Sequence, residues 1–565
     1  MVGDLSGMGP DADTGGFAIV GLGCRLPGGI VDLAGLWKAL EAGRDLVGEI
    51  PEDRFEAARF VDTAMARPGK SYTAKGGFLA DIAEFDADCF GISPREAAQM
   101  DPQHRLLLET AVEALDDAGI DPGTPAGSDT CVFIGISDFS YAGLQMPRAR
   151  QMNAYAMAGG AHAIAANRLS HFFDLRGPSM VIDTACSSSP VAVERACREL
   201  TSGSSRTALA GGFSLLLNPS GFIGFSQASM LSKRGRCAAF SADADGFVRA
   251  EGAGVVVLKP LADAMADGDP IHGVIAASGS NCDGRTAGLS LPSARAQEGL
   301  LRRVYERAGI APDEVVYIEA HGTGTQAGDP AECTAPGRAL GVARSVGPLP
   351  IGSVKSHVGH LEPASGMAGL FKALAVLRHG TIPRLPAPGT AQPRHRLRRA
   401  RSGTGGTGAS AAGAPGAALR RRQLLRVRRG ECPCGRRPAL PALAAPRFAA
   451  LLPADGELGG HSRQDPVAAL AGLTPDEALE AVSGTLAELP ARILQTDAAH
   501  LGARQPLQEH GVDSLMAAEL LTTPRQRLDV EIPPMELLQG GITLTDLARH
   551  VLLRLGVRTT DTANG

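Results

Sequence analysis

The sequence has no apolar run long enough to cross a bilayer, and its first residues show no secretory signal pattern. These absences argue against a membrane-spanning or secreted protein, so we expect a cytoplasmic protein with no membrane partner. The chain has 55 Lys and Arg residues against 60 Asp and Glu residues, a formal net charge of -5. This balance gives no overall signal for nucleic-acid binding.

The ten cysteines also lack the spacing of a metal site. Most lie in segments expected to form strands or helices, which indicates reduced thiols rather than disulfides. The run Cys432-Pro433-Cys434 is a weak metal candidate. We therefore predict no bound metal ion.

Regular alternation of apolar and helical segments indicates an α/β protein. At 565 residues the chain has room for about three to five domains. Apolar runs such as 254–258 alternate with helical patterns such as 296–308. This alternation is typical of buried sheets covered by helices.

The clearest chemical signal is Cys186, in the run Asp183-Thr184-Ala185-Cys186-Ser187-Ser188-Ser189. Residues 179–182 are predicted to form a buried strand and residues 190–200 a helix, so Cys186 is expected on a strand-to-helix turn. There the helix dipole would lower the thiol pKa and favour the nucleophilic thiolate. Taken alone, a cysteine is more often structural, because free cysteine is among the most buried residue types.

Two histidine motifs follow, Glu319-Ala320-His321-Gly322-Thr323-Gly324-Thr325 and Gly352-Ser353-Val354-Lys355-Ser356-His357-Val358-Gly359-His360. His321 comes directly after the apolar stretch 315–318, which is expected to be a strand. Its local chemistry also fits a core histidine beside an ordinary turn. A cysteine with two histidines supplies a nucleophile and separate groups for managing protons.

Together these motifs resemble the Cys-His-His site of β-ketoacyl synthases, which form carbon–carbon bonds in fatty acid and polyketide assembly. Similar segments at 17–28, 90–103 and 246–249 extend the resemblance to type I modular polyketide synthases over about residues 16–383. It implies that Cys186 carries an acyl thioester and that His321 and His360 promote decarboxylation of a malonyl extender. Lys355 matches the lysine of the family's second motif. His357 stands where the family usually has asparagine, and we assign it no role.

The resemblance also implies a fold and an assembly. The expected fold is the thiolase-like layered α/β/α/β/α arrangement of two similar halves, with Cys186 in the first half and both histidines in the second. Such synthases are usually homodimers. A cysteine rather than a glutamine at position 186 implies condensation rather than a decarboxylating loading role.

A second motif, Glu509-His510-Gly511-Val512-Asp513-Ser514-Leu515-Met516, resembles the phosphopantetheine site of acyl carrier proteins. A serine at a helix start suits a phosphodiester, because free backbone N–H groups and the dipole favour an anion there. An isolated match could equally be a helix N-cap. Helical patterns at 475–493 and 545–555 flank the motif, so we expect an all-α four-helix carrier domain. Ser514, beside Asp513, would bear a covalent 4'-phosphopantetheine.

Between these regions the chain changes composition. Residues 394–437 contain thirteen Arg, one acidic residue and no aromatic residue. Composition alone would support a disordered basic linker or a nucleic-acid patch. Read one base forward, plausible codons for residues 422–435 give Gly-Asn-Ser-Phe-Gly-Phe-Gly-Gly-Ala-Asn-Ala-His-Val. This string resembles the terminal glycine-rich motif of β-ketoacyl synthases, which supplies a core strand and an oxyanion-hole N–H.

We therefore predict that the reading frame changes shortly after Pro383 and returns before the carrier domain. The expected organisation is a tail (1–15), a β-ketoacyl synthase (16–385), its out-of-frame C-terminal part (386–446), a linker (447–473), the carrier domain (474–556) and a tail (557–565). If the frame is real protein, the alternative is a carrier or scaffold protein with a damaged, inactive synthase.

The stretch from Pro383 to the carrier is too short for an acyltransferase and has no Gly-x-Ser-x-Gly elbow. The extender unit would therefore be loaded by an acyltransferase acting in trans, and Ser514 would be modified by a phosphopantetheinyl transferase. The expected substrates are acyl and malonyl-type thioesters.

Overall fold

The computed structural model describes residues 15–63, 67–145, 155–288, 290–386, 402–404, 473–493, 505 and 543–555. Within these ranges, no helix combines the length and the apolar character needed to cross a membrane.

The first half of the synthase region is built on a six-stranded sheet. Its strand order is β5-β4-β6-β7-β1-β8, formed by β1 (Phe17–Arg25), β4 (Cys131–Gly135), β5 (Ser179–Ile182), β6 (Ala208–Ser214), β7 (Gly252–Pro260) and β8 (Gly273–Ile275). Strand β4 runs parallel to β5 and β6, whereas β7 is antiparallel to β6 and β1. Every residue of β4 and β6 is buried, because helices cover both faces of this sheet.

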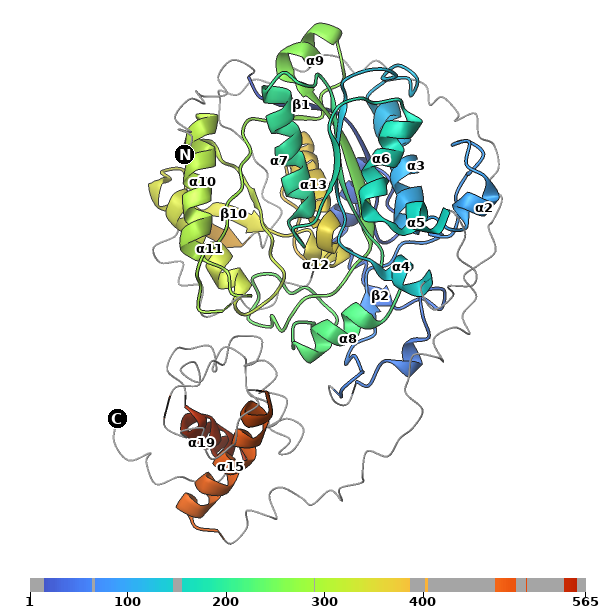
Figure 1. The fold of residues 1–565 in the computed structure, drawn as a ribbon. Helices are drawn as coiled ribbons and strands as arrows, with labels where there is room; N and C mark the ends of the chain where they lie inside the picture. The colour runs from blue at the N-terminus through green and yellow to red at the C-terminus, as the bar shows by residue number, and fades with distance from the viewer. Residues whose placement is uncertain are drawn as a thin grey trace, which may run out of the picture.

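Two helical layers enclose this sheet (Figure 1). One face packs against α3 (Pro102–Asp117) and α6 (His162–Phe172), and the other against α7 (Ser188–Thr201) and α13 (Ser365–His379). A separate apolar core fills each interface, with Phe133 and Phe371 on the α7/α13 side and Phe213 and Leu107 on the α3/α6 side. The middle strands β4 and β6 are therefore fully buried, whereas the end strands β5 and β8 are only partly buried, with Met180 of β5 40% exposed.

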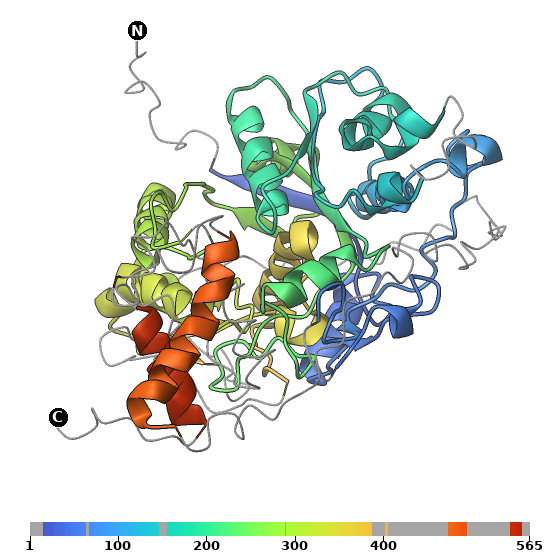
Figure 2. The same cartoon turned by 60° about the horizontal axis from the view of Figure 1, so that its bottom comes forward.

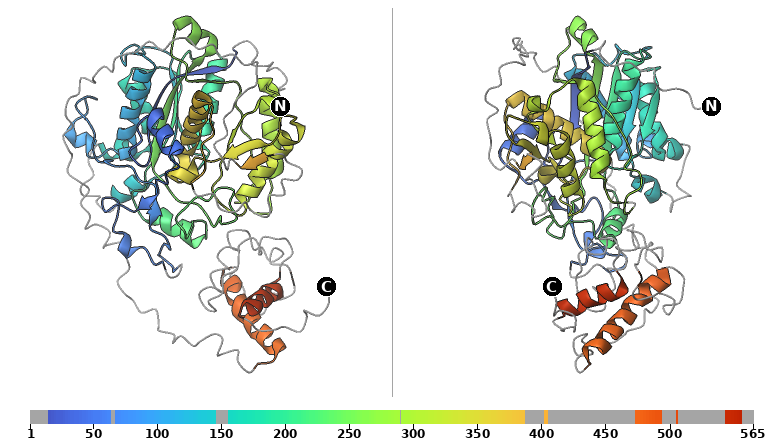
Figure 3. Two further views of the ribbon diagram at one scale, coloured as in Figure 1. Left: turned by 180° about the vertical axis from the view of Figure 1, so that it is seen from behind. Right: turned by 90° about the vertical axis from the view of Figure 1, so that its left-hand side faces the viewer.

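The second half has a smaller sheet of order β11-β10-β9, formed by β9 (Ile318–Glu319), β10 (Leu349–Gly352) and β11 (Ser402–Thr404). Both pairings in it are parallel. It lies between α13 and an outer layer of α10 (Ala294–Ala308) and α11 (Gly328–Ala339) (Figures 1 and 3). The described residues thus form the expected α/β/α/β/α layers.

Several sequence predictions match these elements, and one differs in extent. The strand at 179–182 and the helices at 475–493 and 296–308 are present within one or two residues at each end. The strand expected at 315–318 is confined to Ile318–Glu319. Among the described residues this strand pairs with β10 alone, and only Ile318 and Glu319 take part in that pairing.

The remaining elements connect or border these layers (Figure 2). They are the helices α1 (Leu33–Glu41), α2 (Pro94–Ala97), α4 (Ser140–Gln145), α5 (Tyr155–Gly160), α8 (Ser220–Gln227), α9 (Leu261–Asp267) and α12 (Lys355–Val358), the strands β2 (Gly48–Glu49) and β3 (Lys75–Gly76), and the 3-10 turns η2 (Ala57–Arg59), η4 (Pro312–Glu314), η5 (Gly341–Ala343) and η6 (Glu362–Ala364).

Two helices of the carrier region are described, α15 (Pro475–Ile493) and α19 (Leu544–Arg554). They pack together through buried apolar side chains such as Val482, Leu486 and Val551. Helix α19 begins with a capping box, in which the side chains of Thr543 and Asp546 each accept from the other residue's backbone N–H. The other two helices expected for this domain lie outside the described residues.

Candidate active site

Cys186 lies on the predicted turn between β5 and α7. The turn is tight, with Ala185 at a φ of 54° in the left-handed region, and short hydrogen bonds hold it. The backbone N–H of Thr184 donates to Ser188 Oγ at 2.9 Å, and Ser188 Oγ donates to the Ala185 carbonyl at 2.6 Å. The small side chains around Cys186 allow this crowded backbone to form, and the cysteine is half-buried at the start of α7.

His321 follows β9 by two residues, at the carboxyl end of the strand. Its backbone N–H and that of Gly322 donate to the carboxylate of Glu332 on α11, the second at 2.7 Å. Gly322 has a φ of 43°, and a Cβ there would lie 2.5 Å from the Cβ of Ser353. The glycine is therefore required for the close approach of this loop to the loop carrying Lys355.

His360 is buried, and two groups of the chain that follows it contact its Nδ1. The backbone N–H of Glu362 donates to its Nδ1 at 2.9 Å, and Ser365 Oγ lies 2.8 Å from the same atom. A backbone N–H can only donate, so Nδ1 must be the unprotonated nitrogen of the neutral ring. The neutral tautomer therefore carries its proton on Nε2, the nitrogen free to act on a substrate.

The structure brings Cys186, His321 and His360 together. One nitrogen of each histidine and the Cys186 sulfur all lie within 4.8 Å of one another, and the two imidazole centroids are 5.2 Å apart at nearly a right angle. Residues 135 to 174 positions apart in the chain thus converge, because Cys186 follows a strand of the first half and the two histidines follow strands of the second.

Lys355 supplies a buried positive charge to this cluster. Its side chain belongs to a residue only 4% exposed, and burial lowers its pKa while the nearby carboxylates of Glu332 and Glu319 oppose that change. Burial and then the Lys355 charge lower the pKa of His360 well below its usual value, and the same two causes lower the pKa of His321. Both imidazoles are therefore neutral at pH 7.

The direction of the Cys186 pKa differs from the sequence-based expectation. Burial raises the thiol pKa above its ordinary value, and the Lys355 ammonium opposes that shift without reversing it. The helix dipole alone would have lowered it, so desolvation is the larger influence at this position. The resting site accordingly favours a neutral thiol.

The three clustered side chains form a ligand set that zinc can also use. Burial and then the Lys355 ammonium lower the pKa of both histidines, and the same ammonium would repel a cation held by these side chains. The arrangement therefore fits a nucleophile with two neutral hydrogen-bond donors better than a cation site.

His357, the departure in the second motif, is fully buried away from these contacts. Its Nδ1 lies 2.9 Å from the Arg44 carbonyl oxygen, and burial lowers its pKa to about 4. The ring therefore ties the Lys355 loop to the loop after α1.

Sequence reasoning missed the residues that hold the cluster in place. Glu332 fixes the His321 loop, while Ser365 and the Glu362 backbone fix His360. Glu319 accepts from the Val354 N–H at 2.6 Å. Glu332 lies two residues after the run Gly328-Asp329-Pro330, at the start of α11. The predicted carrier residues Asp513 and Ser514 lie outside the described residues.

Comparison with known families agrees with this geometry. Residues 16–264 match the family described as "Beta-ketoacyl synthase, N-terminal domain", and residues 272–387 match "Beta-ketoacyl synthase, C-terminal domain". Residues 484–551 match "Phosphopantetheine attachment site". A 4'-phosphopantetheine on a serine is the group that such a domain carries.

Individual relatives point the same way. The chain is 49% identical over 367 residues to one of the phenolphthiocerol/phthiocerol polyketide synthase subunits of Mycobacterium tuberculosis, covering 65% of this chain and 20% of the relative. The oxazolomycin ketosynthase domain of Streptomyces albus is 39% identical with a TM-score of 0.67, covering 70% of this chain and 71% of that one. A ketosynthase from module 6 of the bacillaene synthase of Bacillus subtilis is 37% identical with a TM-score of 0.65, covering 71% and 68%.

These structural matches confirm the thiolase-like fold predicted from the sequence. The chain spans about a fifth of the length of the polyketide synthase polypeptides that it matches.

Proposed function

Because this chain belongs to the β-ketoacyl synthase family, whose members are acyl-transferring condensing enzymes, we propose that it catalyses decarboxylative condensation in polyketide assembly. The acyl group is held on Cys186, and the second substrate is a malonyl-type thioester on a carrier protein. The observation that carries this proposal is the approach of Cys186, His321 and His360 to within 4.8 Å.

The first step transfers the acyl group. The Cys186 sulfur attacks the carbonyl carbon of an incoming acyl thioester, its proton passes to the departing thiolate, and a thioester on Cys186 results. The Lys355 ammonium favours the thiolate form that attacks, against the burial that disfavours it. Because Cys186 lies at the start of α7, the helix dipole also stabilises its thiolate form, as Lys355 does.

The second step joins the two substrates. The malonyl-type thioester loses CO₂, and the resulting enolate oxygen accepts hydrogen bonds from neutral imidazoles. His360 donates through Nε2, because its Nδ1 already accepts from the backbone N–H of Glu362. The ring of His321 lies beside that of His360 and supplies the second donor. The enolate carbon attacks the carbonyl carbon of the Cys186 thioester, and the bond from that carbon to the Cys186 sulfur breaks. Cys186 leaves as a thiolate that takes up a proton from solvent, and a β-ketoacyl thioester remains on the carrier.

The experiment is to incubate the full chain with an acyl thioester and locate the acyl group by peptide mass spectrometry. We expect it on Cys186 and not on the exposed Cys89 or Cys282, which serve as internal controls. Added malonyl thioester should then release CO₂ and discharge Cys186, and His321→Ala or His360→Ala should leave acylation intact but block discharge. Equal acylation of all three cysteines would reject the proposal.

The alternative, a carrier or scaffold protein with an inactive synthase region, is less well supported. Both halves of the synthase match the family, and the residues of its catalytic motifs converge. The nucleic-acid reading of the arginine-rich segment has no support outside its composition. We propose that Ser514, within the matched attachment domain, carries the phosphopantetheine and Asp513 supports it.

We further propose that the protein works as a homodimer, as ketosynthase domains of polyketide synthases typically do. Strand β5 is at one end of the six-stranded sheet, and its far edge is unpaired within the described part of the chain. Met180 on β5 is 40% exposed. An edge of this kind invites pairing with a second copy, so Met180→Lys should weaken the dimer in sedimentation analysis.

The same proposal includes two partner enzymes, an acyltransferase that loads the carrier and a phosphopantetheinyl transferase. It also includes a cytoplasmic location. They rest on the sequence, where no acyltransferase elbow lies between the synthase and carrier regions.

A further inference from the structure

Arg249 lies opposite His360, on a segment that pairs with it through the backbone. The His360 N–H donates to the Val248 carbonyl at 2.7 Å, and the Ala250 N–H donates to the His360 carbonyl at 2.8 Å. The main chain at His360 is therefore held by the segment that carries Arg249. The His360 ring, in contrast, is held at its Nδ1.

Two groups contact this nitrogen, and only one of them can decide which ring nitrogen carries the proton. A hydroxyl can rotate to donate or to accept, so Ser365 Oγ, at 2.8 Å, is compatible with either neutral tautomer. The Glu362 N–H, at 2.9 Å, can only donate. The orientation of the Glu362 backbone therefore decides whether Nε2 keeps the proton that it offers to the enolate.

Glu362 has a backbone conformation that residues with a side chain rarely adopt. Its φ is 49°, in the left-handed region, where a Cβ crowds the following carbonyl oxygen. Such a conformation persists only where the surrounding structure imposes it. The N–H that reaches His360 therefore depends on a contact elsewhere on Glu362.

The Arg249 guanidinium supplies this contact. Its Nε donates to Glu362 Oε1 at 2.5 Å and its Nη2 to Oε2 at 3.0 Å. Two parallel bonds of this kind fix the orientation of a carboxylate as well as its distance. Both side chains are buried, so without the guanidinium the carboxylate would be a charge without a counter-charge, which favours movement of Glu362 toward water.

Helix α8 in turn holds the guanidinium in place. Arg249 Cζ lies 5.0 Å from the centre of the Phe222 ring and 5.4 Å from that of Phe225, within the range of cation–π attraction. Gly221 leaves the space that the guanidinium fills, because a Cβ there would lie 2.1 Å from Arg249 Nη1. A Cβ on Gly224 of the same helix would have no neighbour among the described residues within 4 Å, apart from the helix's own backbone.

The Arg249 charge also acts on the imidazole itself. Burial lowers the pKa of His360 well below its usual value, and the Lys355 and Arg249 charges add to that effect. A neutral imidazole has a single N–H, so its tautomer decides whether the enolate meets a donor. Arg249 therefore favours the neutral ring, and through Glu362 it directs the one proton of that ring.

We propose that Arg249 is a positioning residue for condensation. It holds Glu362 in the left-handed conformation, so that the Glu362 N–H fixes the proton of His360 on Nε2. The inference rests on the proposed function and extends it, because it assigns a role in enolate stabilisation to a buried side chain that the proposed reaction steps do not use. Disturbing Arg249 should therefore slow condensation more than acylation of Cys186.

The first test compares Gly221→Ala with Gly224→Ala, which add the same methyl group to one helix. Acylation of Cys186 and its discharge by a malonyl thioester are timed separately in the full chain. We expect Gly221→Ala to displace the guanidinium and slow condensation about 10- to 100-fold, with acylation within about twofold, because a misplacement of about 1 Å can cost that much. Gly224→Ala should change neither rate.

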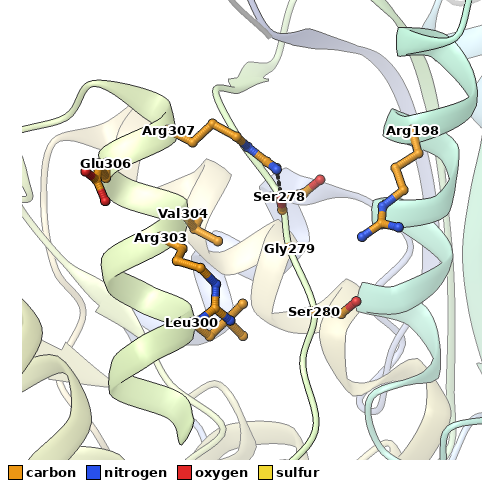
Figure 4. Close-up of a pocket in the computed structure, with 9 residues that line it drawn as sticks. All are labelled: Arg198, Ser278, Gly279, Ser280, Leu300, Arg303, Val304, Glu306 and Arg307. Atoms are coloured by element: carbon orange, nitrogen blue, oxygen red, sulfur yellow. Dashed lines mark hydrogen bonds between the residues drawn. The ribbon is translucent and has the colours of Figure 1, made fainter. Parts of the chain in front are cut away.

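The second test removes the guanidinium and then the backbone strain. Arg249→Met should slow condensation in the same way, whereas Arg303→Met, which removes an exposed arginine of α10 (Figure 4), should not. Glycine adopts the left-handed conformation readily, so R249M/E362G should recover most of the condensation rate and R249M/E362A should not. Both double variants remove the carboxylate, so its lost charge cannot explain a difference between them.

The tautomer of His360 is read from solid-state ¹⁵N spectra of histidine-labelled protein, with its signals assigned by comparison with His360→Gln. We expect the proton on Nε2 alone in the parent chain and in Gly224→Ala. A second set of signals, with the proton on Nδ1, should arise in Gly221→Ala and Arg249→Met. This measurement requires neither substrate nor activity.

Equal condensation rates in Gly221→Ala and Gly224→Ala would overturn the inference, as would an Nε2–H signal alone in every variant. Equal losses of acylation and condensation would show that Arg249 acts only in general packing, and would also overturn it. If the parent chain does not acylate Cys186, the proposed function fails, while the nitrogen signals still decide whether Arg249 sets the tautomer.

Discussion

Replacing Arg249 with methionine should lower the melting temperature of the synthase region by about 4 to 6 °C. Arg249 Nε donates to Glu362 Oε1 at 2.5 Å and Arg249 Nη2 to Oε2 at 3.0 Å, and the two side chains are only 4% and 16% exposed. Removing one partner of such a buried pair costs about 3–5 kcal/mol, because the other charge is left without a counter-charge. An unfolding entropy of roughly 2.1 cal/mol/K per residue, over about 370 residues, gives the temperature shift.

The pair also bears on the site, since the backbone of Glu362 holds His360. The assay is calorimetry at one scan rate, with Lys75→Met as the control. Lys75 Nζ lies at the same 2.5 Å from Glu49, but those side chains are 44% and 64% exposed, so its loss should cost under about 1 kcal/mol. The double variant R249M/E362Q should recover most of the loss. Equal shifts for Arg249→Met and Lys75→Met would refute the argument from burial.

Three further outcomes are expected. Lys355→Met should raise the pH at which iodoacetamide alkylates Cys186, because the ammonium lowers a thiol pKa that burial has raised; a downward move would contradict this. Ser365→Ala should lower the condensation rate less than about tenfold, because the backbone N–H of Glu362 still holds His360. His360→Ala should lower that rate about 10²- to 10³-fold. Equal losses of rate in the two variants would make Ser365 the main residue that holds His360. Thr543→Ala removes a helix cap worth about 1 kcal/mol, so α19 amides should exchange about fivefold faster, and unchanged exchange would mean that the cap is not needed.

The strand, turn and helix around Cys186 could be predicted because they depend on residues close to Cys186 in the sequence. Residues 180–182 are apolar, and the serines after Cys186 suit a helix start, so the strand, turn and helix were predicted. The strand was wrongly expected to be buried, because it lies at the end of the sheet, where Met180 is 40% exposed. The helix begins two residues earlier than expected, at Ser188. Pro190 then stands in the first turn, where a proline costs little, and its ring packs against Gly366 of α13.

The convergence of the cluster could not be derived from local patterns. Its geometry depends on β9 pairing in parallel with β10, with Ile318 opposite Ile351, which places the carboxyl ends of both strands at one edge. The supporting contacts of Glu332 and Ser365 cross between separate loops and helices. The Cys186 pKa was wrong in direction for a related reason, since a sequence shows a helix start but not how much protein buries it.

The two halves of the synthase region contribute different groups to the two chemical steps. Cys186 follows β5, which pairs with the buried strand β4, and hydrogen bonds among the described residues hold its turn. His321 follows a two-residue strand that, among the described residues, pairs with β10 on one side, and the residue as a whole is exposed. Acyl transfer needs only the first half's nucleophile and Lys355, whereas enolate stabilisation needs both histidines held rigidly. A change that loosens the loops carrying His321 and His360 should therefore slow carbon–carbon bond formation more than acylation of Cys186.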